Sequence, residues 1–173
     1  MHDTPGGDGV GGHSVVPMDL HPSLAPVAGL VGRWRGPGRG QYPTITPFEY
    51  TEELTFSATG KPFLHYLQRT WSPSGAAMHT ETGYLRAGGG AMELVLAQPT
   101  GQTELAEGPL EEEADGFAAE LHARVMNAAS AKTVEATIRR LRLRGDELTT
   151  RFAMAAVGVP MTHHLESVLS RIT

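Results

Sequence analysis

The chain has 173 residues, no cysteine, and 19 acidic against 14 basic side chains, which gives a formal net charge of −5. This length suits a single domain with a sizeable core. The acidic balance argues against a nucleic-acid partner, because no basic stripe would offset the repulsion of phosphates. Without cysteine there are no disulfides, thiolate nucleophiles or iron–sulfur clusters, so metal chemistry would fall to carboxylates and to the eight histidines.

Residues 1–18 are rich in glycine and poor in apolar side chains, which predicts a disordered tail ahead of one domain over 19–173. They do not resemble a signal peptide, and no apolar run approaches the roughly 20 residues that span a bilayer. We therefore expect a cytoplasmic protein with no membrane partner. Two prolines and apolar side chains spaced about four apart predict a short helical turn over 21–30.

From Leu30 onward, apolar and polar side chains alternate, with turn residues about every ten positions. After a first strand around Trp34, the expected strands cover 49–57, 62–71, 78–86, 92–97, 103–110, 116–123, 133–143, 147–157 and 162–171. No connection is long enough for a helical crossover, so the strands should be antiparallel. The pattern predicts an all-β fold, an up-and-down barrel of about ten strands shaped like lipocalins and fatty-acid-binding proteins.

Glycines occupy every second position around Trp34 in the segment 32–38. We expect these glycines to leave room where opposite walls of the barrel approach each other, and the indole to plug the closed end. A barrel closed at one end can hold one small hydrophobic ligand. The adjacent carboxylates Glu52 and Glu53 are interpreted as solvated surface charge.

The last strand opens with two adjacent histidines, His163 and His164. Neighbouring side chains on a strand face opposite ways, so only one of the two can enter the barrel, and alternation alone does not say which. In the preceding strand, alternation with Phe152 predicts that Met154 points inward and lines the ligand site. A thioether and aromatic wall suits a flat, polarizable ligand.

Six motifs follow one another in a characteristic order from about Leu30 to Arg171. They are Gly32-x-Trp34-x-Gly36-x-Gly38, Tyr42-Pro43-Thr44, Phe48-x-Tyr50-x-Glu52-Glu53, Gly60-Lys61-Pro62, Met78-His79-x-Glu81-x-Gly83-Tyr84 and Pro160-Met161-x-x-His164-Leu165. Each motif alone is weak, but their order and spacing over the whole domain resemble the nitrobindin family.

The resemblance implies a ten-stranded barrel that binds haem b at its open end. As a ferric haem protein it would bind nitric oxide and isomerise peroxynitrite to nitrate. The family's proximal iron ligand, a histidine directly before leucine, corresponds to His164, which would be both the metal ligand and the catalytic residue. The resemblance also implies cofactor contacts from Thr44 and Lys132, and from Met78 and His79 on the distal side.

Two other functions fit the same container. One is a non-catalytic carrier of a lipid or another hydrophobic ligand, and the other is a haem-based nitric oxide sensor. Barrels of this kind often pair through an outer face, so a homodimer is left open as well.

Overall fold

The computed structural model describes residues 19–173, and the tail predicted for residues 1–18 lies outside them. The described part contains one 3-10 helix, η1 (Pro22–Leu30), and ten strands. The strands are β1 (Gly32–Tyr42), β2 (Ile45–Ala58), β3 (Leu64–Trp71), β4 (Ala77–Gly88), β5 (Ala91–Ala97), β6 (Gln102–Glu113), β7 (Gly116–Asn127), β8 (Val134–Arg144), β9 (Glu147–Ala156) and β10 (Val159–Ile172). No helix in this part of the chain is both long and apolar enough to cross a membrane.

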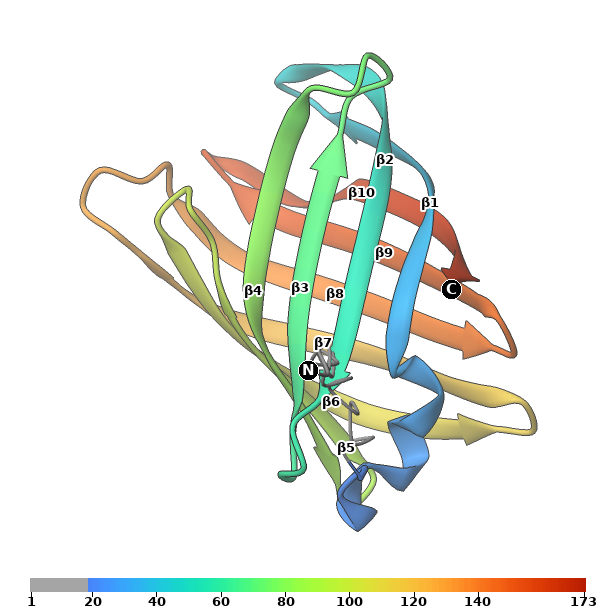
Figure 1. The fold of residues 1–173 in the computed structure, drawn as a ribbon. Helices are drawn as coiled ribbons and strands as arrows, with labels where there is room; N and C mark the ends of the chain where they lie inside the picture. Colours follow the sequence, from blue (N-terminus) through green and yellow to red (C-terminus); the bar gives the residue numbers. More distant parts are fainter. Residues whose placement is uncertain (1–18) are drawn as a thin grey trace, which may run out of the picture.

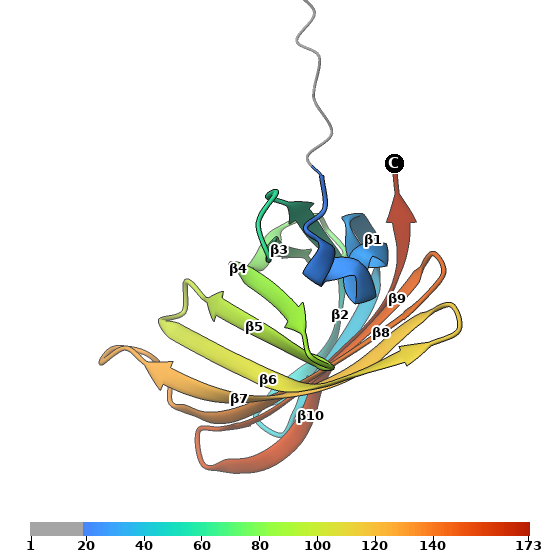
Figure 2. The same cartoon turned by 90° about the horizontal axis from the view of Figure 1, so that it is seen from below.

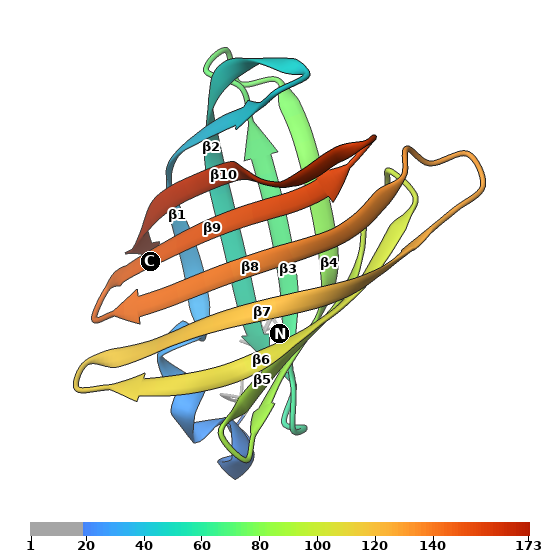
Figure 3. The same ribbon diagram turned by 180° about the vertical axis from the view of Figure 1, so that it is seen from behind.

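The strands form a closed antiparallel barrel, in which each strand pairs with its sequence neighbours and β1 pairs with β10. This confirms the predicted all-β, ten-stranded barrel. In Figure 1, β2 to β4 lie in front of β6 to β10, and Figure 3 shows the same two halves of the wall from behind. Because every hairpin reverses the chain, the loops after β1, β3, β5, β7 and β9 gather at the end of the barrel away from η1, which we call the open end.

The opposite end is closed by η1, which packs against β4 and β7 on different sides of the barrel and lies across its mouth in Figure 2. Leu24, Val27 and Leu30 are fully buried on the inner side of η1. Beneath them Trp34 is fully buried, and its Nε1 donates a hydrogen bond to the Leu30 carbonyl at 2.8 Å. The indole therefore fills the closed end, as the sequence predicts.

The glycines of β1 have a different role from the one predicted. Gly38 pairs with Tyr50 and Gly40 with Phe48 on the neighbouring strand β2. A Cβ at either glycine would overlap the ring of its partner. Gly38 and Gly40 thus make room for aromatic rings of the neighbouring strand β2, whereas a Cβ at Gly36 would overlap the backbone of Val168 on the other neighbour, β10. None of the three makes room for the opposite wall of the barrel.

The prediction that Glu52 and Glu53 are solvated is wrong, since they are only 2% and 3% exposed. Glu52 points into the barrel, where Ser167 and Gln68 donate hydrogen bonds to it. Glu53 lies on the outer face, where arginines of β1 and β3 cover it. Its ion-pair partners are Arg33 at 3.1 Å, Arg35 at 3.3 Å and Arg69 at 3.3 Å. Strand alternation predicts that the two residues lie on opposite faces of β2, but it does not predict the hydrogen-bond and ion-pair partners that bury them.

Candidate ligand site at the open end of the barrel

His164 is the extra residue of a β-bulge in β10. His163 pairs with Ala153 of β9 and Leu165 pairs with Phe152, so His164 has no partner on β9. The buried side chains of Ser167 and Leu169 face the interior, and strict alternation from them would turn His163 inward instead. The bulge adds one residue and reorients the side chain, as bulges do beside binding sites.

The imidazole of His164 lies among three aromatic rings from three other strands. Its ring centroid is 5.3 Å from that of Tyr42, 6.3 Å from Phe48 and 6.2 Å from Phe152. Its Nδ1 lies 2.8 Å from the carbonyl oxygen of Gln41. A carbonyl oxygen can only accept a hydrogen bond, so Nδ1 carries the proton and Nε2 of the neutral ring keeps its lone pair.

Burial lowers the pKa of His164, and this outweighs the hydrogen bond to Gln41, which acts in the other direction. The neutral imidazole is therefore favoured, with Nε2 available to coordinate a metal. His163 differs in its surroundings, because its Nε2 lies 4.0 Å from the carboxylate of Glu166, which also pairs with Arg39 on the outer face.

The remaining predicted cofactor contacts all lie near the open end, but not all of them line the interior. Met154 is half-buried and pairs with the buried Thr137, so its side chain lies on the inner face. His79 is half-buried at the start of β4, with its Nε2 3.8 Å from the buried carboxylate of Glu81.

Three of the predicted contacts are exposed. Thr44 lies in the turn between β1 and β2, and Lys132 lies in the loop between β7 and β8. Met78, beside His79 at the irregular start of β4, is 46% exposed. The structure thus brings His164, Met154 and His79 to the inner side of the open end, with Thr44 and Lys132 on the loops around it and Met78 facing solvent.

Below this level lies a buried cluster of charged residues that the sequence reasoning missed. Arg139 of β8 bonds both to Glu81 of β4 and to Glu104 of β6. Its guanidinium also lies over the ring of Phe152, 4.8 Å from the centroid. The sequence does carry a signal that these charged residues face inward. Arg139, for example, lies two and four residues before the inward-facing Leu141 and Leu143, and so on the same face of β8.

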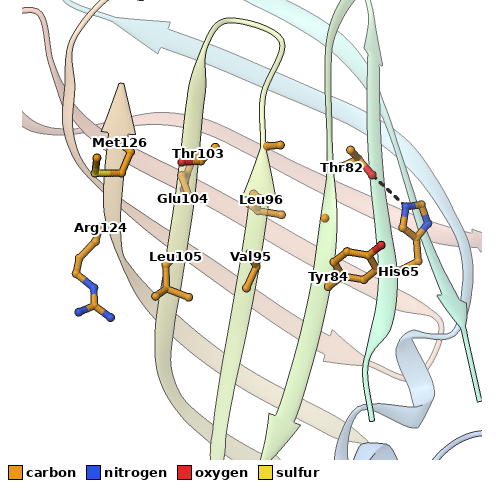
Figure 4. Close-up of a pocket in the computed structure, with 12 residues that line it drawn as sticks. His65, Thr82, Tyr84, Val95, Leu96, Thr103, Glu104, Leu105, Arg124 and Met126 are labelled. Atoms are coloured by element: carbon orange, nitrogen blue, oxygen red, sulfur yellow. Dashed lines mark hydrogen bonds between the residues drawn. The ribbon is translucent and has the colours of Figure 1, made fainter. Parts of the chain in front are cut away.

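A separate hollow lies on the outer wall across β4 to β7 (Figure 4). Tyr84, Val95 and Met126 contribute exposed apolar side chains to it. At its edge His65 is hydrogen-bonded to Thr82 at 3.0 Å. These side chains lie on the outer face of the wall, and His164 does not line the hollow.

The two histidines at the open end, His164 and His79, do not form a metal-binding cluster. Within residues 19–173, no group of three or more His, Asp or Glu side chains could hold a metal ion. A lone histidine supplies one donor atom, which suits a metal whose other ligands come from a macrocycle.

Comparisons with known proteins agree with this geometry. The sequence model of the THAP4-like, haem-binding β-barrel domain matches residues 23–171. A relative from Mycobacterium marinum, named peroxynitrite isomerase 2, is 47% identical over 90% of this chain and 99% of its own length. Another from Nocardia farcinica, named peroxynitrite isomerase, is 48% identical over 88% of this chain and 92% of its own length.

Among solved structures, Rv2717c from M. tuberculosis matches with a TM-score of 0.87 and 45% identity, over 90% of this chain and all of that one. The family model covers most of the barrel, from within η1 to the end of β10. The chain therefore belongs to the THAP4-like, haem-binding β-barrel family.

Proposed function

We propose that this protein binds haem b through Nε2 of His164 and isomerises peroxynitrite to nitrate. The observation that carries the proposal is the hydrogen bond from Nδ1 of His164 to the Gln41 carbonyl, 2.8 Å long, because it fixes the tautomer in which Nε2 is free to bind iron. The family's haem-binding description and the names of relatives at 46–48% identity support the same function.

The residues around His164 fit a porphyrin. Aromatic rings of Tyr42, Phe48 and Phe152 surround the imidazole, and such rings suit the flat, apolar faces of the macrocycle. Met154, on the inner face, adds a polarizable thioether. Thr44 and Lys132, exposed on the surrounding loops, are proposed to contact the polar edge of the cofactor.

When bound, haem iron would supply a Lewis acid toward an oxygen of peroxynitrite. The protein's own contribution is to hold the proximal imidazole in one tautomer and one orientation. On the other wall, His79 is kept near the buried carboxylate of Glu81 at 3.8 Å. We propose that His79, held at this position, donates a hydrogen bond from a ring N–H to the oxyanion substrate.

The isomerase activity is tested by following peroxynitrite decay and the yield of nitrate in stopped-flow experiments. Haem-loaded protein is expected to accelerate the decay and to raise the share of nitrate among the products, whereas the apoprotein and haem-free buffer do neither. A decay rate equal to that of the apoprotein would contradict the proposed activity. Native mass spectrometry of the purified protein that found a fatty acid in place of haem would favour a lipid carrier instead.

Nitric oxide is proposed as a second small ligand of the haem iron, and a shift of the absorption bands on adding it tests this. A nitric oxide sensor would share this shift but would not accelerate peroxynitrite decay. The cytoplasmic location expected from the sequence stays a prediction, which cell fractionation would test.

A homodimer is proposed through the outer hollow of Figure 4, where Tyr84, Val95 and Met126 are 47%, 43% and 73% exposed. Exposed apolar side chains gathered in one hollow favour association. Light scattering after size exclusion is expected to give twice the chain mass for the wild type and the chain mass for Val95→Lys. A monomeric wild type would contradict the proposal.

A further inference from the structure

Arg139 joins two carboxylates across the interior of the barrel. Its terminal nitrogens bond to both oxygens of Glu81 at 2.7 and 2.9 Å. Its Nε and a terminal nitrogen bond to both oxygens of Glu104 at 3.0 and 2.8 Å. The Arg139 side chain is 11% exposed and the two carboxylates are 2% and 1% exposed, so all three charges lie in the interior.

Every other partner of the two carboxylates is also a donor. The hydroxyl of Tyr66 donates to Glu81 at 2.8 Å, and the hydroxyl of Thr137 donates to Glu104 at 2.7 Å. Burial tends to raise the pKa of Glu81, but Arg139 and His79 lower it to about 2. Two carboxylates whose oxygens accept hydrogen bonds from these donors therefore share one guanidinium, so the cluster holds one acidic group more than it has basic groups.

The cluster reaches both histidines of the proposed site. On one side, Phe152 packs against Arg139 and also against His164, with 4.8 Å from its centroid to the guanidinium and 6.2 Å to the imidazole. On the other side, Glu81 lies 3.8 Å from His79. The cluster as a whole is thus one aromatic ring away from the proposed iron ligand, inside a barrel where charges are weakly screened.

We propose that the Glu81–Arg139–Glu104 cluster favours ferric over ferrous iron in this protein. This inference rests on the proposed haem site and adds a group of residues that does not touch the cofactor but acts through its charge. Ferric haem carries one more positive charge than ferrous haem, so a fixed negative charge in a medium of low dielectric constant stabilises it. Arg139 is shared by both carboxylates, so one of them has no guanidinium of its own.

The neighbouring buried acid Glu52 differs from the cluster because its partners are neutral. Ser167, Gln68 and Thr150 donate to it, and burial raises its pKa. The tyrosines nearby add no charge, since burial raises the pKa of both Tyr50 and Tyr66. Glu81 and Glu104 are therefore the carboxylates to change in a test.

The test is the Fe(III)/Fe(II) midpoint potential of haem-loaded protein, measured by spectroelectrochemistry. Glu104→Gln keeps the shape of the side chain and removes the surplus acidic group, so the potential is expected to shift to a more positive value. Glu81→Gln removes the other carboxylate and is expected to shift the potential in the same direction. The matched control is Glu120→Gln, which changes an exposed glutamate on the outer face of β7 and is expected to leave the potential unchanged.

Arg139→Lys separates the effect of charge from that of hydrogen-bond geometry. Lysine keeps the positive charge but cannot make bidentate contacts to both carboxylates. Its potential is expected to stay closer to that of the wild type than those of the two glutamine variants. Thermal melting of the apoproteins identifies any variant that does not fold, and either glutamine variant alone is sufficient for the test.

A potential that stays unchanged or falls in the folded glutamine variants overturns the inference. If peroxynitrite turnover persists in that case, only the role of the cluster fails. If the wild type does not take up haem at all, the proposed function fails with it, so the two failures are distinguishable.

Discussion

At the scale of single residues, two glycines determine where the aromatic wall of the site can lie. Gly40 faces the ring of Phe48, and Phe48 in turn lies 6.3 Å from the imidazole of His164. Gly38 makes the same room for Tyr50. The absence of a side chain at Gly40 thus sets the position of the Phe48 ring, which in turn lies beside the proposed iron ligand.

Gly40→Ala is expected to displace Phe48, because the new Cβ would overlap its ring. Such overpacking costs about 1–3 kcal/mol of unfolding free energy, and haem should also dissociate faster from the variant. Chemical denaturation and haem transfer to a scavenger protein measure the two effects. Gly88→Ala is the control, since a Cβ there meets nothing within 4 Å; equal behaviour of the two variants would contradict this role of Gly40.

The choice between the two adjacent histidines shows how far residue patterns can lead. Alternation alone left the choice open, and extending it from Ser167 and Leu169 would even favour His163. The bulge that turns His164 inward is a property of the pairing between β9 and β10, which no local pattern in β10 encodes. The family resemblance implies His164 because it relies on the position of a motif and not on strand periodicity, and this choice stays a prediction.

At the scale of elements, η1 and the end of β10 close the barrel together. Arg171 donates hydrogen bonds to the carbonyls of Gly29 and Val31 at 2.7 and 2.9 Å, and its guanidinium lies 4.2 Å from the centroid of the Trp34 ring. The helical turn was predicted from its prolines and apolar spacing. Pro22 and Pro26 lack amide donors, which is consistent with a 3-10 helix in place of a regular α-helix.

Leu24→Ala is expected to destabilise the closed end without changing the open end. Leu24 is fully buried, so the variant should lose about 2–5 kcal/mol of unfolding free energy, while the folded protein keeps its haem absorption spectrum. Urea unfolding and a haem titration measure the two properties. Ala25→Ser, on the exposed side of η1, serves as the control, and a changed haem spectrum in Leu24→Ala would contradict the separation of the two ends.

At the scale of the whole molecule, the type of side chain that fills the interior changes along the barrel axis. Apolar side chains fill the closed end, the buried cluster of Arg139 lies between the walls, and aromatic rings surround His164 at the open end. The number and direction of the strands could be predicted from alternation and turn residues. Alternation signals that these charged residues face inward, but their partners could not be predicted, because they come from strands distant in the sequence, as Glu81 and Arg139 do.

The buried cluster makes the stability of the molecule depend on pH. The pKa of Glu81 is about 2 in the folded protein, below its usual value of 4.5. Its ionised form therefore stabilises the fold above pH 4.5, and this contribution is lost as the pH falls toward 2. Glu81→Gln removes one of the two carboxylate partners of Arg139 while Glu104 remains, and is expected to lose about 1.5–3 kcal/mol at pH 7, as for hydrogen bonds to charged groups.

Urea unfolding of the wild type and Glu81→Gln at several pH values tests this dependence. The difference between the two proteins should shrink as the pH falls from 4.5 toward 2. Glu52→Gln gives the opposite sign, because the raised pKa of Glu52 stabilises the fold below 4.5 and this contribution is lost as the pH rises through the folded value. A difference for Glu81→Gln that is constant over the acid range would rule out the pKa shift.

The central claim is that His164, and not its neighbour, holds the haem iron. A haem titration of the wild type, His164→Ala and His163→Ala, followed by absorption in the Soret region, tests it most directly. The account predicts that His164→Ala loses the Soret band of the bound cofactor, whereas His163→Ala keeps the spectrum and affinity of the wild type. A His164→Ala protein with the wild-type spectrum and affinity would contradict it.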